Sequence, residues 1–77
     1  MRFTAEELNT VLLYIKEHAD RGVFTVESYP SIAAQTGLRA GRVAAVFYFL
    51  CGKGKILQEG KTVLLLENTL YEDGAVL

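Results

Sequence analysis

The chain has 77 residues, enough for one domain with a modest core, and a self-contained catalytic pocket would compete with that core for apolar side chains. Hydrophobic residues make up 51% and charged residues 22%, a balance that excludes a disordered chain. The net charge of −1 predicts no general affinity for nucleic acid. We therefore expect a small folded domain that is not an enzyme and needs no cofactor.

The charges are unevenly distributed along the chain. Residues 28–66 contain five basic residues and one acidic residue, a net charge of +4, and the rest of the chain carries −5. Such a separation creates a polar field that can orient an anionic partner. Chance placement of solvated charges is the alternative explanation.

Metal, redox and membrane chemistry find little support in the sequence. Cys51 is the only cysteine, and we expect a small buried hydrophobe there, with redox sensing or intermolecular pairing as alternatives. His18 is the only histidine and lacks the partner ligands of a metal site. No apolar run approaches the roughly 20 residues that span a bilayer, and the first residues lack the core of a signal peptide. We expect a cytoplasmic protein with no metal site and no membrane partner.

The first predicted element is a helix with a clear start. Thr4 and Glu7 have the spacing of a capping box, and Phe3 can pack on Leu8 as a hydrophobic staple. Gly22 is the predicted stop. The buried face of this helix repeats at helical spacing: Leu8, Val11, Leu12, Ile15 and Ala19.

Two further helices follow a short extended segment. Residues 23–26 (VFTV) predict a short strand or an extended bridge. Ser28 can cap the next helix, with Pro30 in its first turn and Gly37 at its end. The third helix starts after Leu38 and frays beyond Cys51. Its predicted buried face is Val43, Val46, Phe47 and Leu50.

The last predicted element is a β-hairpin. Residues 56–58 and 61–66 are expected to form two strands around a tight turn at residues 59–60, where glycine supplies a positive φ. We interpret residues 1–66 as one domain. Residues 67–77 form an acidic C-terminal tail with an apolar end, either loose or docked.

The segment around Gly37 carries the most specific pattern. Residues 32–38 (IAAQTGL), with Val43 five positions after Leu38, have the spacing of a helix-turn-helix in which glycine permits the sharp turn. With the preceding helix and the following hairpin, the chain resembles winged helix-turn-helix domains, particularly MarR-like bacterial and archaeal regulators. The resemblance covers residues 32–66. It implies a mostly α fold with a small β part (α+β), three helices plus a C-terminal β-hairpin wing.

The resemblance also implies a function. In that family the third helix enters the major groove with its N-terminal turn, and the wing touches an adjacent minor groove or phosphates. Arg39 and Arg42 would lie at the groove, where arginine pairs with guanine or with phosphate. We therefore expect a transcriptional regulator that binds double-stranded DNA as a homodimer. The residues implied in DNA contact are Gln35, Thr36, Arg39, Arg42, Lys53, Lys55 and Lys61.

The third helix departs from the family pattern on its outward side. Positions that are often polar are Ala40, Gly41 and Ala45, and the aromatic residues Tyr48 and Phe49 lie further along the same side. Exposed apolar patches on small domains mark interfaces. The second hypothesis is therefore a protein–protein adaptor that uses Ala45, Tyr48 and Phe49. Cover by the tail or the first strand, or DNA contact through Tyr48, are the alternatives for this patch.

Overall fold

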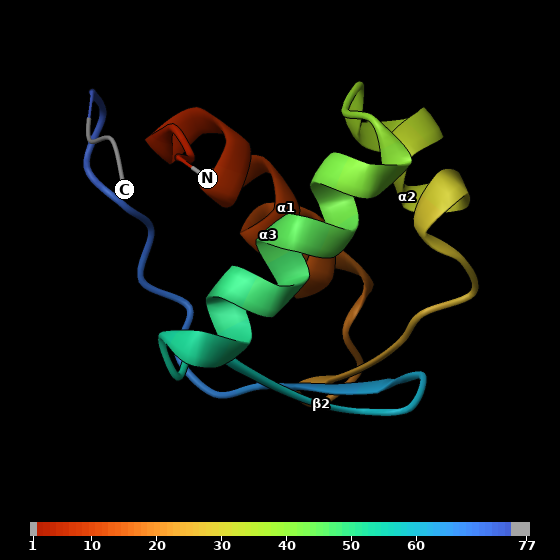
Figure 1. Ribbon diagram of the computed structural model, residues 1–77. Coiled ribbons are helices and arrows are strands. Elements are labelled where there is room, and N and C mark those ends of the chain that lie inside the picture. The colour runs from red at the N-terminus through yellow and green to blue at the C-terminus, as the bar shows by residue number, and fades with distance from the viewer. Residues whose placement is uncertain (1, 75–77) are drawn as a thin grey trace.

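The computed structural model describes residues 2–74 and confirms a mixed α+β fold of three helices and a three-stranded antiparallel sheet, consistent with a winged-helix layout. In Figure 1, α3 crosses in front of α1, and the sheet lies below the helices. Residues 75–77 of the expected tail lie outside the described residues. The elements are α1 (Ala5–His18), β1 (Val23–Thr25), α2 (Tyr29–Thr36), α3 (Ala40–Gly52), β2 (Ile56–Glu59) and β3 (Thr62–Leu65).

The start of α1 follows the predicted capping box. The Thr4 hydroxyl accepts a hydrogen bond from the Glu7 backbone N–H at 3.2 Å, and the Glu7 carboxylate accepts one from the Thr4 backbone N–H at 3.2 Å. Phe3 and Leu8 are both buried in the core. Two N–H groups that an uncapped helix would leave unpaired are therefore satisfied, which fixes where α1 begins. No helix within residues 2–74 is long and apolar enough to cross a membrane.

The expected role of Gly22 as the end of the first helix is wrong. The helix ends at His18, and the next chain reversal lies between Asp20 and Val23, which exchange two backbone hydrogen bonds of 2.8 and 3.0 Å. Arg21 and Gly22 have φ values of 54° and 80°, as the two central residues of a type I′ turn require. Glycine is therefore needed here for the turn into β1, and not for the helix end.

The two helices of the helix-turn-helix have the predicted boundaries to within two residues. The Ser28 hydroxyl caps α2 by accepting from the Ser31 N–H at 3.1 Å. Gly37, with φ 79°, closes α2 in the left-handed conformation that glycine adopts without strain. The predicted core face of α3 is confirmed, because all four residues are at most 1% exposed: Val43, Val46, Phe47 and Leu50.

The hairpin β2–β3 is joined by β1, which pairs with β3 on the side opposite β2, so the sheet order is β1–β3–β2. Its turn lies at Gly60-Lys61, one residue later than predicted, because Glu59 still pairs with Thr62. Gly60 has φ 59° at the first central position, as in a type II′ turn. The inner face of the sheet contributes three buried residues to the core: Phe24, Ile56 and Val63.

The segment after β3 packs against α1. Of the two expected states of the C-terminal tail, loose or docked, the structure shows the docked one as far as Tyr71. The Asn9 side chain donates to the Tyr71 carbonyl at 2.9 Å and accepts from the Tyr71 N–H at 2.8 Å. Figure 1 shows this blue segment rising beside the helices from the end of the sheet.

Candidate nucleic-acid interface

The turn between α2 and α3 presents some of the expected DNA-contacting residues and uses another for its own geometry. The Thr36 hydroxyl donates to the Ile32 carbonyl at 2.8 Å and accepts from the Leu38 N–H at 3.5 Å, so it braces the turn. Gln35 is exposed at the end of α2. Arg39 is exposed at the N-cap of α3 and makes no capping hydrogen bond with its side chain. Gln35 and Arg39 are therefore available to a ligand that approaches this turn.

Arg42 lies in the first turn of α3, and its side chain is bound within the domain. Its Nη2 donates to Glu7 Oε1 at 2.9 Å, its Nε pairs with the other carboxylate oxygen, and Nη2 also donates to the Arg2 carbonyl. The guanidinium carbon lies 4.7 Å from the centre of the Phe3 ring. The hydrogen bond from Arg42 is the largest of the effects that lower the pKa of Glu7 to about 2. In the free protein, Arg42 therefore connects α3 to α1.

Lys55, at the start of the hairpin, is engaged in a similar way. Its ammonium pairs with the Glu67 carboxylate, donates to the Thr69 carbonyl at 2.8 Å and lies 4.8 Å from the centre of the Tyr71 ring. The hydrogen bond from Lys55, followed by those from Thr69, lowers the pKa of Glu67 to about 2. Only 13% of the Lys55 side chain is exposed. This lysine fastens the segment after β3 to the hairpin.

The two other lysines of the expected set are exposed and lie on different elements of the fold. Lys53 follows the last turn of α3, with its ammonium 5.5 Å from the centre of the Phe49 ring, and Lys61 lies in the hairpin turn. Arg39 and Lys53 flank a helix of 13 residues, roughly 20 Å long at 1.5 Å per residue. The structure therefore spreads the free cations over the length of α3 and the tip of the wing.

The outward side of α3 is apolar in its second half. Tyr48 is 84% exposed, whereas Phe49 is half-buried because its ring lies 5.0 Å from that of Phe3. Cover for Phe49 therefore comes from Phe3 in the N-terminal segment, and not from the tail or the first strand as the alternatives above proposed. Tyr48 borders an open hollow of about 530 Å³ that also includes the half-buried Ala45. The hollow is lined by Phe3, Ala45, Tyr48, Phe49, Gly52 and Lys53.

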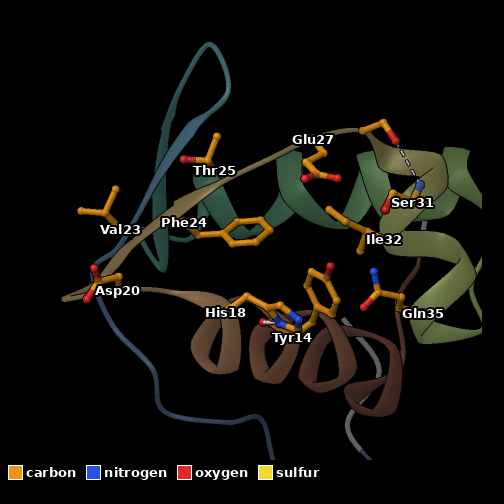
Figure 2. Close-up of a pocket in the computed structure, with 11 residues that line it drawn as sticks. Tyr14, His18, Asp20, Val23, Phe24, Thr25, Glu27, Ser31, Ile32 and Gln35 are labelled. Carbon is orange, nitrogen blue, oxygen red and sulfur yellow. Dashed lines mark hydrogen bonds between the residues drawn. The ribbon is translucent and has the colours of Figure 1, made fainter.

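A second hollow of about 420 Å³ lies between α1, β1 and α2 (Figure 2). The Tyr14 and His18 rings stack there with centres 4.1 Å apart, and His18 Nδ1 lies 2.8 Å from the Tyr14 carbonyl. Figure 2 shows the Phe24 ring and the Glu27 side chain directed into the hollow. No group of three or more potential metal ligands occurs within residues 2–74. The polar side chains that line this hollow can offer hydrogen bonds to a polar ligand.

The segment that contains α2 and α3 contributes no acidic side chain of its own, although Glu7 of α1 contacts Arg42 there. From Ser28 to Gln58 the sequence contains no aspartate or glutamate, and all nine acidic residues lie outside this segment. The nearest acids in the sequence are Glu27 and Glu59. Comparison of the chain with family models, with curated proteins and with solved structures finds no match in any of the three.

Proposed function

We propose that this protein is a winged-helix transcriptional regulator that binds double-stranded DNA through the N-terminal turn of α3 and the tip of the β2–β3 wing. The observation that carries the proposal is the absence of carboxylates from residues 28–58. The exposed arginine at the start of α3, Arg39, lies within that segment. A polyanion that approaches α2 and α3 therefore meets cations without competing acids from these helices.

The chemistry of the contact follows from the few polar side chains that are free. The Arg39 guanidinium can donate two parallel hydrogen bonds to guanine O6 and N7, and Gln35 can bond a base edge or a phosphate. Lys61 at the wing tip is suited to a phosphate. The small residues Ala40 and Gly41 let the start of α3 approach the groove closely but read no bases. We therefore expect affinity to come mainly from phosphates, with a modest sequence preference.

Arg42 and Lys55 belong to this proposal only if their intramolecular ion pairs open. The contact of Arg42 with Glu7 is a two-point one, and Lys55 has two oxygen partners after β3. Arg39 and Lys61 are therefore the two expected cations that lie at the proposed contact and need no rearrangement of the free protein, whereas Lys53 lies at the other end of α3.

Titration of a fluorescent duplex, followed by anisotropy at low salt, tests DNA binding directly. The logarithm of the association constant should fall linearly with the logarithm of the salt concentration, because each neutralised phosphate releases counterions. With two free cations at the interface, Arg39 and Lys61, the expected slope is about −2. If addition of the protein changes the anisotropy of no duplex at low salt, this function is excluded.

The exposure of Tyr48 favours a second candidate, a protein–protein adaptor. Aromatic residues such as tyrosine that become buried on binding supply much of the binding energy of many interfaces. Tyr48 is exposed beside a hollow lined mainly by apolar residues. Lys53 at the edge of the hollow favours a partner with a carboxylate beside an apolar residue. Tyr48→Ala should abolish capture of such a partner and leave DNA affinity unchanged. Loss of DNA affinity in this variant, without loss of folding, would contradict the adaptor.

A further inference from the structure

The outer face of the sheet carries a row of apolar side chains that crosses all three strands. In the strand register Val23 lies opposite Leu64, and Leu64 lies opposite Leu57. These three side chains are 40%, 38% and 53% exposed, whereas their neighbours along each strand, such as Phe24, Val63 and Ile56, are buried. The outer row is therefore continuous across the sheet and faces away from the core.

This row breaks the pattern of a sheet that has one face in water. Such antiparallel sheets alternate buried apolar residues with polar outward ones, whereas strands covered on both faces are apolar throughout. β3 and the residue after it read Thr-Val-Leu-Leu-Leu, and the outward Leu66 is 58% exposed. Four of the seven large hydrophobic residues that are exposed within residues 2–74 belong to these three strands or directly follow them. The part of the outer face that carries Val23, Leu57, Leu64 and Leu66 therefore has the composition of a covered surface.

We propose that the outer face of the sheet is the contact between two copies of this chain, packed sheet against sheet. The outward positions of the strands contain no lysine or arginine, which argues against DNA as the occupant. Their one charge is Glu59, in a second outward row with Thr25 and Thr62. A second copy therefore brings apolar side chains to the apolar row with little charge repulsion.

Two-fold symmetry places the same surface of each copy against itself. A two-fold axis that lies between the two sheets and passes over Leu64 places the apolar row of one copy against that of the other. The same axis moves the two Glu59 carboxylates to opposite ends of the contact. Sheets packed in this way lie about 10 Å apart, with the inner side chains of each sheet interdigitated. The other apolar surface, around Tyr48, is less suited to self-contact because each copy presents Lys53 there without an acidic partner on α2 or α3.

This contact goes beyond the proposed DNA binding and does not depend on it. It uses the face of the sheet, whereas the proposed DNA contact uses the start of α3 and the hairpin turn. A monomeric protein that still binds DNA would overturn the sheet contact alone. A dimer that binds no DNA would overturn the proposed function alone.

Sedimentation equilibrium of the full chain, over concentrations from micromolar to millimolar, tests the contact. We expect a reversible monomer–dimer equilibrium that Leu57→Lys and Leu64→Lys shift toward monomer by at least about tenfold in dissociation constant. Tyr48→Lys and Leu13→Lys are matched controls, since they place the same charge at exposed apolar positions on α3 and α1. Both should leave the equilibrium unchanged. Circular dichroism shows whether each variant is folded.

A second measurement needs no substitution. In a mixture of isotope-labelled and unlabelled wild-type chains, filtered nuclear Overhauser spectra should show contacts between copies at the methyl groups of Leu57 and Leu64. A chain that stays monomeric at millimolar concentration overturns the proposal. So does a dimer that is disrupted by Tyr48→Lys and not by Leu57→Lys, or one whose intermolecular contacts lie on α3.

Discussion

The guanidinium of Arg42 in the first turn of α3 donates to the carboxylate of Glu7 in the first turn of α1, with 2.9 Å between Nη2 and Oε1. The same guanidinium reaches the Arg2 carbonyl and covers the Phe3 ring. Glu7 also closes the capping box of α1, so one carboxylate serves both the helix start and the contact between helices. The arginine that the family resemblance assigns to DNA is therefore a structural residue in the free protein.

Replacement of Arg42 should destabilise the domain. Arg42→Ala removes the partner of a half-buried carboxylate and uncovers Phe3, and we expect the Tm to fall by roughly 5 °C for a domain of this size. Arg39→Ala is the matched control, because it removes the same side chain three residues earlier, where it is exposed. Thermal unfolding followed by circular dichroism measures both. Equal Tm values for the two variants would show that the ion pair contributes nothing to stability.

Acid should weaken the fold through the same carboxylate. The pKa of Glu7 is lowered from 4.5 to about 2, chiefly by the hydrogen bond from Arg42. Because this pKa is lower in the folded state, ionised Glu7 stabilises the fold fully above pH 4.5, and that contribution is lost as the pH falls through about 2. Nuclear magnetic resonance titration of the Glu7 side-chain carbonyl carbon should give a midpoint near 2. In the Arg42→Ala variant the midpoint should move back toward 4.5.

Substitutions on the proposed DNA interface should separate base contacts from phosphate contacts. Arg39→Ala should weaken specific binding by about 1–3 kcal/mol if the guanidinium pairs with a base. Lys61→Ala should weaken all duplexes alike and reduce the salt slope by about one. Lys16→Ala, on the exposed side of α1, is the control with the same change of charge as Lys61→Ala. Anisotropy titrations across a salt series measure all three. Unchanged affinity in the double variant Arg39→Ala/Lys61→Ala would place the DNA elsewhere or nowhere.

Truncation of two neighbouring aromatic residues of α3 should affect the stability of the domain to very different extents. Phe47 is 1% exposed, with its ring 5.3 Å from that of Tyr29, and Phe47→Ala should reduce the free energy of unfolding by about 3–5 kcal/mol. Tyr48 is 84% exposed, and Tyr48→Ala should change it by less than about 0.5 kcal/mol in the monomer. Urea unfolding measures both values. A large loss in Tyr48→Ala would mean that the hollow beside it is covered in solution.

The two glycines that flank the start of α3 should also differ. Gly37 has φ 79°, so Gly37→Ala forces a left-handed alanine and should reduce the free energy of unfolding by about 1–2 kcal/mol. Gly41 lies in the helix with open space around it, so Gly41→Ala should be neutral or stabilising by up to about 1 kcal/mol. Urea unfolding again provides the measurement. If Gly41→Ala weakens DNA binding without loss of stability, close backbone approach to the groove is supported.

Local signals in the sequence predicted the fold, and contacts between distant segments account for what was missed. The capping box at Thr4 and the glycine at the end of α2 depend on residues at most four positions apart, so sequence spacing was sufficient to predict them. The pair of Glu7 and Arg42 spans 35 positions, and no periodic pattern predicts which arginine a carboxylate will meet. Phe3 and Phe49 are also far apart in the sequence, so local spacing does not predict their contact.

Part of the apolar row on the outer face of the sheet could be predicted from the sequence. The alternation of residues 62–66 places two leucines on the face opposite Val63, and that signal predicts a sheet covered on both faces. The extended segment 23–26 gave no indication of where it would pair, because antiparallel register depends on the whole sheet. The apolar row therefore became visible only once β1 was placed beside β3.

The backbone N–H of Val26 donates to the carbonyl of Lys61 at 2.8 Å, so the tip of the wing is bonded to the chain just before α2. A hairpin tip without such a bond samples many orientations and loses that freedom when it binds a partner. Here the hairpin tip has already lost that conformational entropy on folding. The backbone of Lys61 therefore keeps a fixed position relative to α2. The wing and α2 should therefore respond as one rigid body, so that strain applied to the hairpin by a ligand is transmitted to the start of α2.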